Sequence, residues 1–160
     1  MLASCERSLK LLQTDYVDLL QIHWPDHDVP FDETVEALLQ LKQAGKVRAI
    51  GVCNHGKIDI DDYMQAGGEM ISNQLPYSLL WRAIEFEVLP KCEQHQVGIL
   101  AYSPLMQGLL TGKYSTADSF PEGRARTKIF SSDRAGARHG GPGHERLTFA
   151  TLARIQEICD

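Results

Sequence analysis

The chain has 160 residues, 43% of them hydrophobic, which is enough for one domain with a sizeable core. Its formal net charge of −5 gives generic nucleic-acid binding no electrostatic support. No apolar run approaches the roughly 18–20 residues of a membrane span, and Glu6 and Arg7 come too early for the apolar region of a signal peptide. The four cysteines show neither CxxC pairing nor ligand-like spacing, so we expect free thiols and a cytoplasmic protein.

Hydrophobic periodicity predicts alternating helices and strands over the first 101 residues. We expect Ser4 to cap the first helix and Gly45 to end the second, which begins at Asp32. A third helix is expected to stop before Gly67, and Pro90 is expected to kink or break a fourth. The predicted helices are 3–12, 32–44, 58–65 and 83–96, and the predicted strands are 16–22, 47–53, 70–74 and 97–101, the last of them buried.

The rest of the chain is predicted to be a long loop at about 102–144 followed by a helix at about 145–159, within a single partial domain over 1–160. Strands that alternate with helices are joined by right-handed crossovers, in either a doubly wound sheet or a (β/α)8 barrel. No Gly-x-Gly-x-x-Gly follows a strand, which argues against a dinucleotide site of the Rossmann type. Four βα units are half of a barrel that usually needs about 250 residues. We therefore predict an α/β fold, a partial (β/α)8 TIM barrel.

Chemistry in such barrels collects where the strands end. The residues there are His23, Asn54, Gln74 and Tyr102, which together suit a flat ring that bears an amide. A histidine at a strand end is more often structural than catalytic. His23, His27 and Asp28 also raise the alternative of a metal site, although two of them lie in a loop that offers little rigidity. The basic residues from Arg124 onward form either a solvated loop or a phosphate clamp.

Four ordered stretches closely resemble the aldo-keto reductase family. They are Leu9–Pro25, which leads into His23; Gly45–Asn54, with Cys53 where serine is common; Asn73–Ser78; and Tyr102–Tyr114. The resemblance implies a (β/α)8 barrel that binds NADPH or NADH and reduces small aldehydes or ketones to alcohols.

The resemblance also implies a role for each matching residue. His23 would be catalytic and orient the substrate carbonyl, while Tyr102 would stack on the nicotinamide ring. Cys53, Asn54 and Gln74 would surround the nicotinamide carboxamide. The residues implied to line the pyrophosphate and ribose are Ser103, Pro104, Leu105, Met106, Gln107 and Lys113, with Arg124 as a further phosphate contact.

The chain departs from the family's pattern in one respect. The family's proton donor is a tyrosine, supported by a lysine and an aspartate that precede the catalytic histidine. Tyr16 lies within a predicted strand, and no other tyrosine of this sequence fits the donor. We therefore expect the chain by itself to be inactive. Because half of a barrel exposes two strand edges, we also expect it to associate through them. The alternatives are a non-catalytic nucleotide-binding module, similar to a regulatory β-subunit, and a metal-dependent TIM-barrel hydrolase.

Overall fold

A computed structural model describes residues 1–112. They belong to two units, Met1–Pro104 and a second that begins at Leu105. The first unit contains the helices α1 (Leu2–Leu12), α2 (Phe31–Gln43), α3 (Lys57–Gln65) and α4 (Val88–Gln94), the 3₁₀ helix η1 (Ala83–Glu85), and the strands β1 (Val17–Ile22), β2 (Val47–Cys53), β3 (Ser72–Pro76) and β4 (Gly98–Tyr102). The described part of the second unit is the 3₁₀ helix η2 (Met106–Thr111) and its flanking residues. Within residues 1–112, no helix is long and apolar enough to span a membrane.

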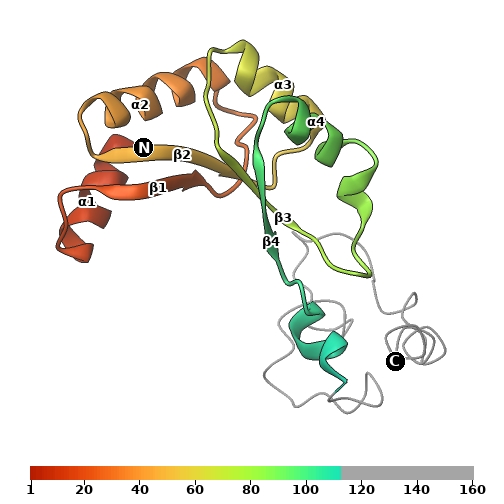
Figure 1. Ribbon diagram of the computed structural model, residues 1–160. Helices are drawn as coiled ribbons and strands as arrows, with labels where there is room; N and C mark the ends of the chain where they lie inside the picture. Colours follow the sequence, from red (N-terminus) through yellow and green to blue (C-terminus); the bar gives the residue numbers. More distant parts are fainter. Residues whose placement is uncertain (113–160) are drawn as a thin grey trace. The chain divides into compact units, whose positions relative to one another are not determined.

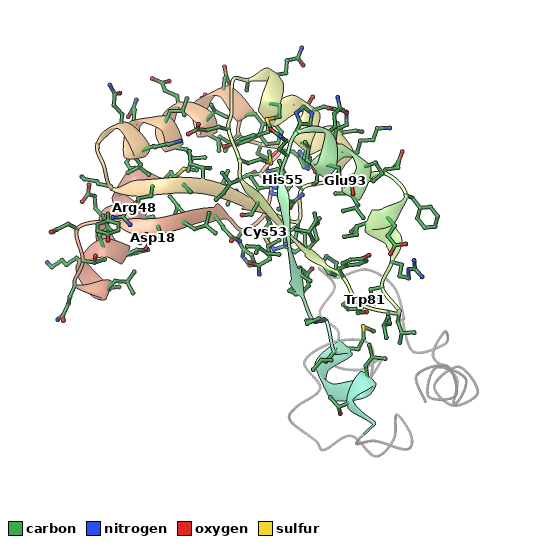
Figure 2. All side chains as sticks on the ribbon, in the orientation of Figure 1. Asp18, Arg48, Cys53, His55, Trp81 and Glu93 are labelled. Carbon is green, nitrogen blue, oxygen red and sulfur yellow. The ribbon has the colours of Figure 1, made fainter. Side chains whose placement is uncertain are left out.

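The strands form one parallel sheet in the order β1-β2-β3-β4, so each strand pairs with the next along the chain. Figure 1 shows α2, α3 and α4 along one side of this sheet. The first two strands begin near the exposed ion pair of Asp18 with Arg48, and β2 runs from there to Cys53 (Figure 2). This order of parallel strands and covering helices is the partial (β/α)8 barrel that the sequence predicts.

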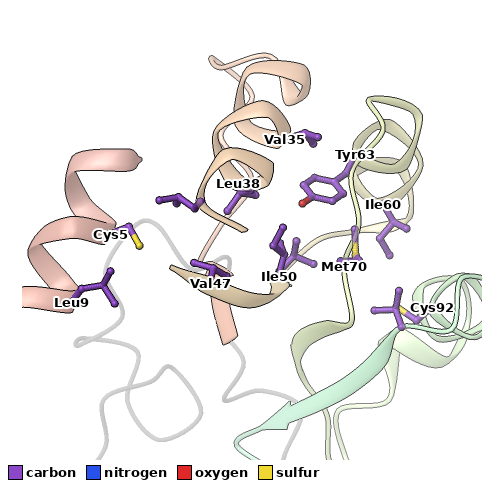
Figure 3. Packing of buried hydrophobic residues seen from close by; sticks show 13 residues of the cluster. Cys5, Leu9, Val35, Leu38, Val47, Ile50, Ile60, Tyr63, Met70 and Cys92 are labelled. Atoms are coloured by element: carbon purple, nitrogen blue, oxygen red, sulfur yellow. The ribbon is translucent and has the colours of Figure 1, made fainter. Parts of the chain in front are cut away.

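The core lies between the sheet and its helices (Figure 3). Cys5 and Leu9 are four residues apart on α1, and both are buried, as helical spacing requires. On α2 the buried residues are Val35, Leu38 and Leu41. Leu39 is 38% exposed, because it lies about 100° around the helix from Leu38.

Three helix boundaries differ from the sequence-based prediction. Ser4 lies inside α1 and does not cap it, because the helix already begins at Leu2. The expected helix 83–96 is divided into η1 and α4, and the break falls at Phe86, which is 84% exposed. Pro90 lies in the first turn of α4, where its missing N–H costs no helical hydrogen bond, so it does not kink the helix. Met106–Thr111, expected within a loop, is helical.

The last strand was expected to be buried, and this prediction is wrong. β4 is the outer strand of the sheet, and Leu100 is 41% exposed. A continuous apolar run is typical of a strand that is covered on both faces, whereas the described helices α2, α3 and α4 lie along one face of this sheet.

Gly68 provides a test of this packing. A Cβ atom at Gly68 would lie 2.7 Å from the carbonyl oxygen of Tyr63 and 2.5 Å from its ring atom Cδ1, and Tyr63 is fully buried. We expect Gly68→Ala to lower the free energy of unfolding by about 1–3 kcal/mol, the usual cost of overpacking, in urea denaturation. Gly98→Ala is the control, since its Cβ would meet only the carbonyl oxygen of Ile71 at 3.4 Å. Equal destabilisation by both substitutions would contradict this account.

Candidate active site

The polar residues predicted from the strand ends lie at one edge of the sheet, because parallel strands all end there. His23 follows β1 and is exposed, whereas Cys53 closes β2 and is only 3% exposed. Gln74 in β3 and Tyr102 at the end of β4 are half-buried. Gln74 pairs in register with Cys53, so these two side chains leave the sheet on the same face.

Asn54 joins three of the four strand ends. Its backbone is left-handed, with a φ of 58°, a conformation that asparagine tolerates better than most residues. Its backbone N–H donates to the carbonyl oxygen of Gln74 at 3.0 Å. Its side-chain Nδ2 donates to the carbonyl oxygen of His23 at 3.1 Å, and its Oδ1 accepts from the hydroxyl of Tyr102 at 2.9 Å. The edge is therefore a connected network.

His55 follows the second predicted strand, and its structural role was not among the sequence-based predictions. Its side chain is fully buried, and its ring packs against Phe31 and Tyr63 with centroid distances of 6.0 and 6.1 Å. Its Nδ1 lies 3.1 Å from the carbonyl oxygen of Cys53, and an N–H at Nδ1 donates a hydrogen bond to this oxygen. Its own carbonyl oxygen accepts from Nδ2 of the buried Asn73 at 2.9 Å. His55 thus anchors the backbone on both sides of Asn54. Only its nearness to a strand end could have indicated this role.

Burial keeps the ionisable groups of this network neutral. It lowers the pKa of His55, against weaker opposing effects of the hydrogen bond to Cys53 and of the Asp59 charge. It also raises the pKa of Cys53 and of Tyr102. A thiol whose pKa is raised is a poor nucleophile, so Cys53 contributes an uncharged side chain to the site and not a reactive one.

The structure brings together the predicted site residues of the first unit. His23, Cys53, Asn54, Gln74 and Tyr102 are at one edge, and Ser103 and Pro104 directly follow it. Leu105, Met106 and Gln107 belong to the second unit, where Leu105 is exposed and Met106 is buried. Lys113 and Arg124 lie outside the described residues, as do most of the predicted loop and the predicted last helix. Within residues 1–112, His, Cys, Asp and Glu form no group of three that could hold a metal ion.

The fold and the side chains at the strand ends together define part of a (β/α)8 barrel with an amide-rich site. The family model for the aldo/keto reductase family matches residues 1–160. The chain belongs to the aldo/keto reductase family, as the four sequence motifs indicated.

Curated relatives and solved structures support this assignment. The chain is 46% identical to an aldo-keto reductase of Bacillus subtilis (strain 168), over 72% of this chain and 34% of that protein. It is 43% identical to the NADH-specific methylglyoxal reductase of Escherichia coli (strain K12), over 77% of this chain and 38% of that protein.

Solved structures show the same partial overlap. The glycerol dehydrogenase of Gluconobacter oxydans superposes with a TM-score of 0.76 at 33% identity, over 98% of this chain and 45% of that one. An aldo/keto reductase from Klebsiella pneumoniae, solved with NADP and acetate, gives 0.61 at 39% identity, over 68% and 39%. The chain thus spans between a third and a half of the length of these relatives.

The neutral, buried state of His55 predicts a pH dependence of stability. Because burial lowers its pKa below the ordinary 6.5 in the folded protein, the unfolded chain binds this proton more readily. We expect the free energy of unfolding to fall as the pH drops below about 6.5, by at most about 1.4 kcal/mol per pH unit. His55→Phe should reduce this slope in urea denaturation at several pH values.

His95→Gln is the control for this measurement. His95 caps the C-terminal end of α4 and is half-buried, whereas His55 is fully buried, and the slope should persist in this variant. A slope that is unchanged in His55→Phe would show that His55 does not carry the acid sensitivity.

Proposed function

We propose that this chain supplies the catalytic histidine and the nicotinamide-binding residues of an enzyme that reduces aldehydes or ketones to alcohols with NADPH or NADH. The observation that carries the proposal is the Asn54 network, which holds His23, Gln74 and Tyr102 at one edge of a parallel sheet. Relatives named as reductases of methylglyoxal, a small carbonyl compound, support the reaction class.

The side chains at the edge fit a nicotinamide. Nε2 of Gln74 has no hydrogen-bond partner within residues 1–112, which leaves an amide donor for a carboxamide, and the half-buried ring of Tyr102 suits stacking. When bound, the nicotinamide would supply the hydride. His23 would orient the substrate carbonyl, and Cys53 and Asn54 would border the carboxamide. For the pyrophosphate and ribose we propose Ser103, Pro104, Leu105, Met106, Gln107, Lys113 and Arg124.

The relatives support both nicotinamide cofactors. Structures of the Klebsiella pneumoniae reductase contain NADP or NADPH, whereas the methylglyoxal reductase of Escherichia coli is named NADH-specific. We propose NADP as the main cofactor, with NAD possible. The free thiols of the buried Cys5, Cys53 and Cys92 are compatible with the cytoplasmic location that we propose. Self-association through the edges of β1 and β4 also stays a proposal.

Activity can be tested in a hybrid protein, in which this chain replaces the matching part of the Gluconobacter oxydans dehydrogenase. We expect the hybrid to reduce methylglyoxal with NADPH. His23→Ala should lower kcat by about 10²-fold, because a substrate carbonyl that is no longer oriented loses its reactive geometry. Absorbance at the NADPH band measures turnover.

His95→Ala, at the end of α4, is the matched control in the hybrid and should leave kcat unchanged. The 160-residue chain by itself should show no turnover, because it has no match to the family's tyrosine donor. A hybrid that binds NADPH but turns over no carbonyl substrate would favour the non-catalytic binding module. Turnover by the chain by itself, if lost on His23→Ala, would contradict the expected inactivity of the chain.

A second test separates the ring of Tyr102 from its hydroxyl. Tyr102→Ala removes both, whereas Tyr102→Phe removes only the hydrogen bond to Asn54. Stacking contributes about 0.5–1.5 kcal/mol beyond burial, so Tyr102→Ala should weaken NADPH binding by the hybrid more than Tyr102→Phe does. Tyr102→Ala should also weaken NADPH binding more than Lys113→Ala does at physiological salt, because salt screens the attraction between a lysine and the phosphates. Fluorescence titration measures the three affinities, and a larger effect of Lys113→Ala at high salt would reverse this ranking.

A further inference from the structure

Gln21 on β1 makes a hydrogen bond to the proposed carboxamide-binding residue. Its Nε2 donates to Oε1 of Gln74 at 2.9 Å, although β2 lies between the strands of these two residues in the sheet. Gln21 pairs in register with Gly51, and the neighbouring pair, Ile22 with Val52, packs into the core. Because side chains alternate along a strand, Gln21 lies on the face opposite the helices, as Gln74 does.

Gly51 makes this contact possible. A Cβ atom at Gly51 would lie 3.1 Å from Cγ of Gln21 and 2.5 Å from Oγ of Ser72. The side chain of Gln21 therefore passes over the backbone of β2 through space that any other residue would fill. The absence of a side chain at Gly51 lets two glutamines on non-adjacent strands meet.

The direction of this hydrogen bond decides what Gln74 offers to a ligand. A primary amide has an accepting oxygen at one end and a donating NH₂ group at the other. Gln21 engages the oxygen, and within residues 1–112 the Nε2 atom of Gln74 has no partner. We propose that Gln21 is a positioning residue, which turns the amide of Gln74 so that its NH₂ group donates to the carboxamide oxygen of the nicotinamide. This inference rests on the proposed function.

Holding the amide in one orientation should strengthen cofactor binding. An unheld glutamine has several rotamers and two amide orientations, and it loses this freedom when the ligand binds. Ordering a side chain of this kind costs a few-fold to about ten-fold in affinity. The hydrogen bond from Gln21 orders the Gln74 side chain before the cofactor binds, so this cost does not reduce the affinity.

A double-mutant cycle in the hybrid protein tests the inference by NADPH fluorescence titration. Gln21→Met keeps the length of the side chain but cannot donate, and it should weaken binding by about 3- to 10-fold. In the Gln74→Met background the same substitution should have no effect, because Gln21 acts only through Gln74. Gln40→Met is the matched control: Gln40 lies exposed on α2, where it bonds to Glu36, and binding should not change.

A cofactor analogue tests the direction of the amide. The 3-acetylpyridine analogue of NADPH keeps the carbonyl oxygen but lacks the NH₂ group. Since Gln74 donates to that oxygen, Gln21→Met should weaken binding of the analogue by the same factor. Gln21→Glu is the second variant if Gln21→Met does not fold, because a carboxylate has a similar shape but cannot donate at neutral pH. It should weaken binding at least as much.

The outcomes separate the two proposals. A hybrid that does not bind NADPH overturns the proposed function, and the inference with it. A hybrid that binds NADPH but shows equal effects of Gln21→Met in both backgrounds, or none, overturns the inference alone. An effect that disappears with the analogue would show that Gln74 presents its oxygen to the ligand, which also overturns the inference.

Discussion

The arrangement of the side chains at the strand ends depends on the hydrogen bonds of Asn54, a residue just past the end of β2. Its left-handed backbone lets one residue donate to β3 through its N–H and reach toward β1 and β4 through its side chain. Most other side chains would be strained at this φ, and none of the apolar ones could bond to both His23 and Tyr102. The positions of His23, Gln74 and Tyr102 relative to one another therefore rest on this residue.

The network is made of neutral groups, and burial explains why. A buried base is disfavoured in its charged form, as for His55, and so are buried acids such as Cys53 and Tyr102. All three shifts act in the same direction, toward the uncharged state. Hydrogen bonds between neutral amides, a hydroxyl and carbonyls can keep the same pattern over a broad pH range, which is useful for a site that must hold one geometry.

Much of the fold could be predicted from the sequence because its signals are local. Apolar spacing and the stop at Gly45 located α2, and the β-branched runs located β1 and β2. The prediction was wrong where neighbours in space decide the outcome. Leu100 is apolar but lies on an outer strand, and Pro90 lies in the first turn of α4 because the earlier helix ends before Phe86 and a new one begins at Val88.

The same division holds for the candidate site. Strand ends are visible in the sequence, so the residues that follow them could be named, and the structure places His23, Asn54 and Tyr102 in one network. The contacts of Gln21 and His55 depend on which strands are adjacent and on which face each side chain leaves the sheet. Such contacts require register, and the sequence does not specify register directly.

The strand order has a consequence for how this sheet assembles. Since β1 pairs with β2, β2 with β3 and β3 with β4, every strand pairing joins segments that are close in sequence. Each pairing closes one βα crossover, and because the entropy of loop closure grows with loop length, pairing consecutive strands costs less than pairing strands that are further apart along the chain. Each βα unit can dock onto the one before it as soon as both are available. Synthesis from the N-terminus would therefore build the sheet strand by strand, and the Asn54 bond to Tyr102 would be among the last to form, once β4 has been added.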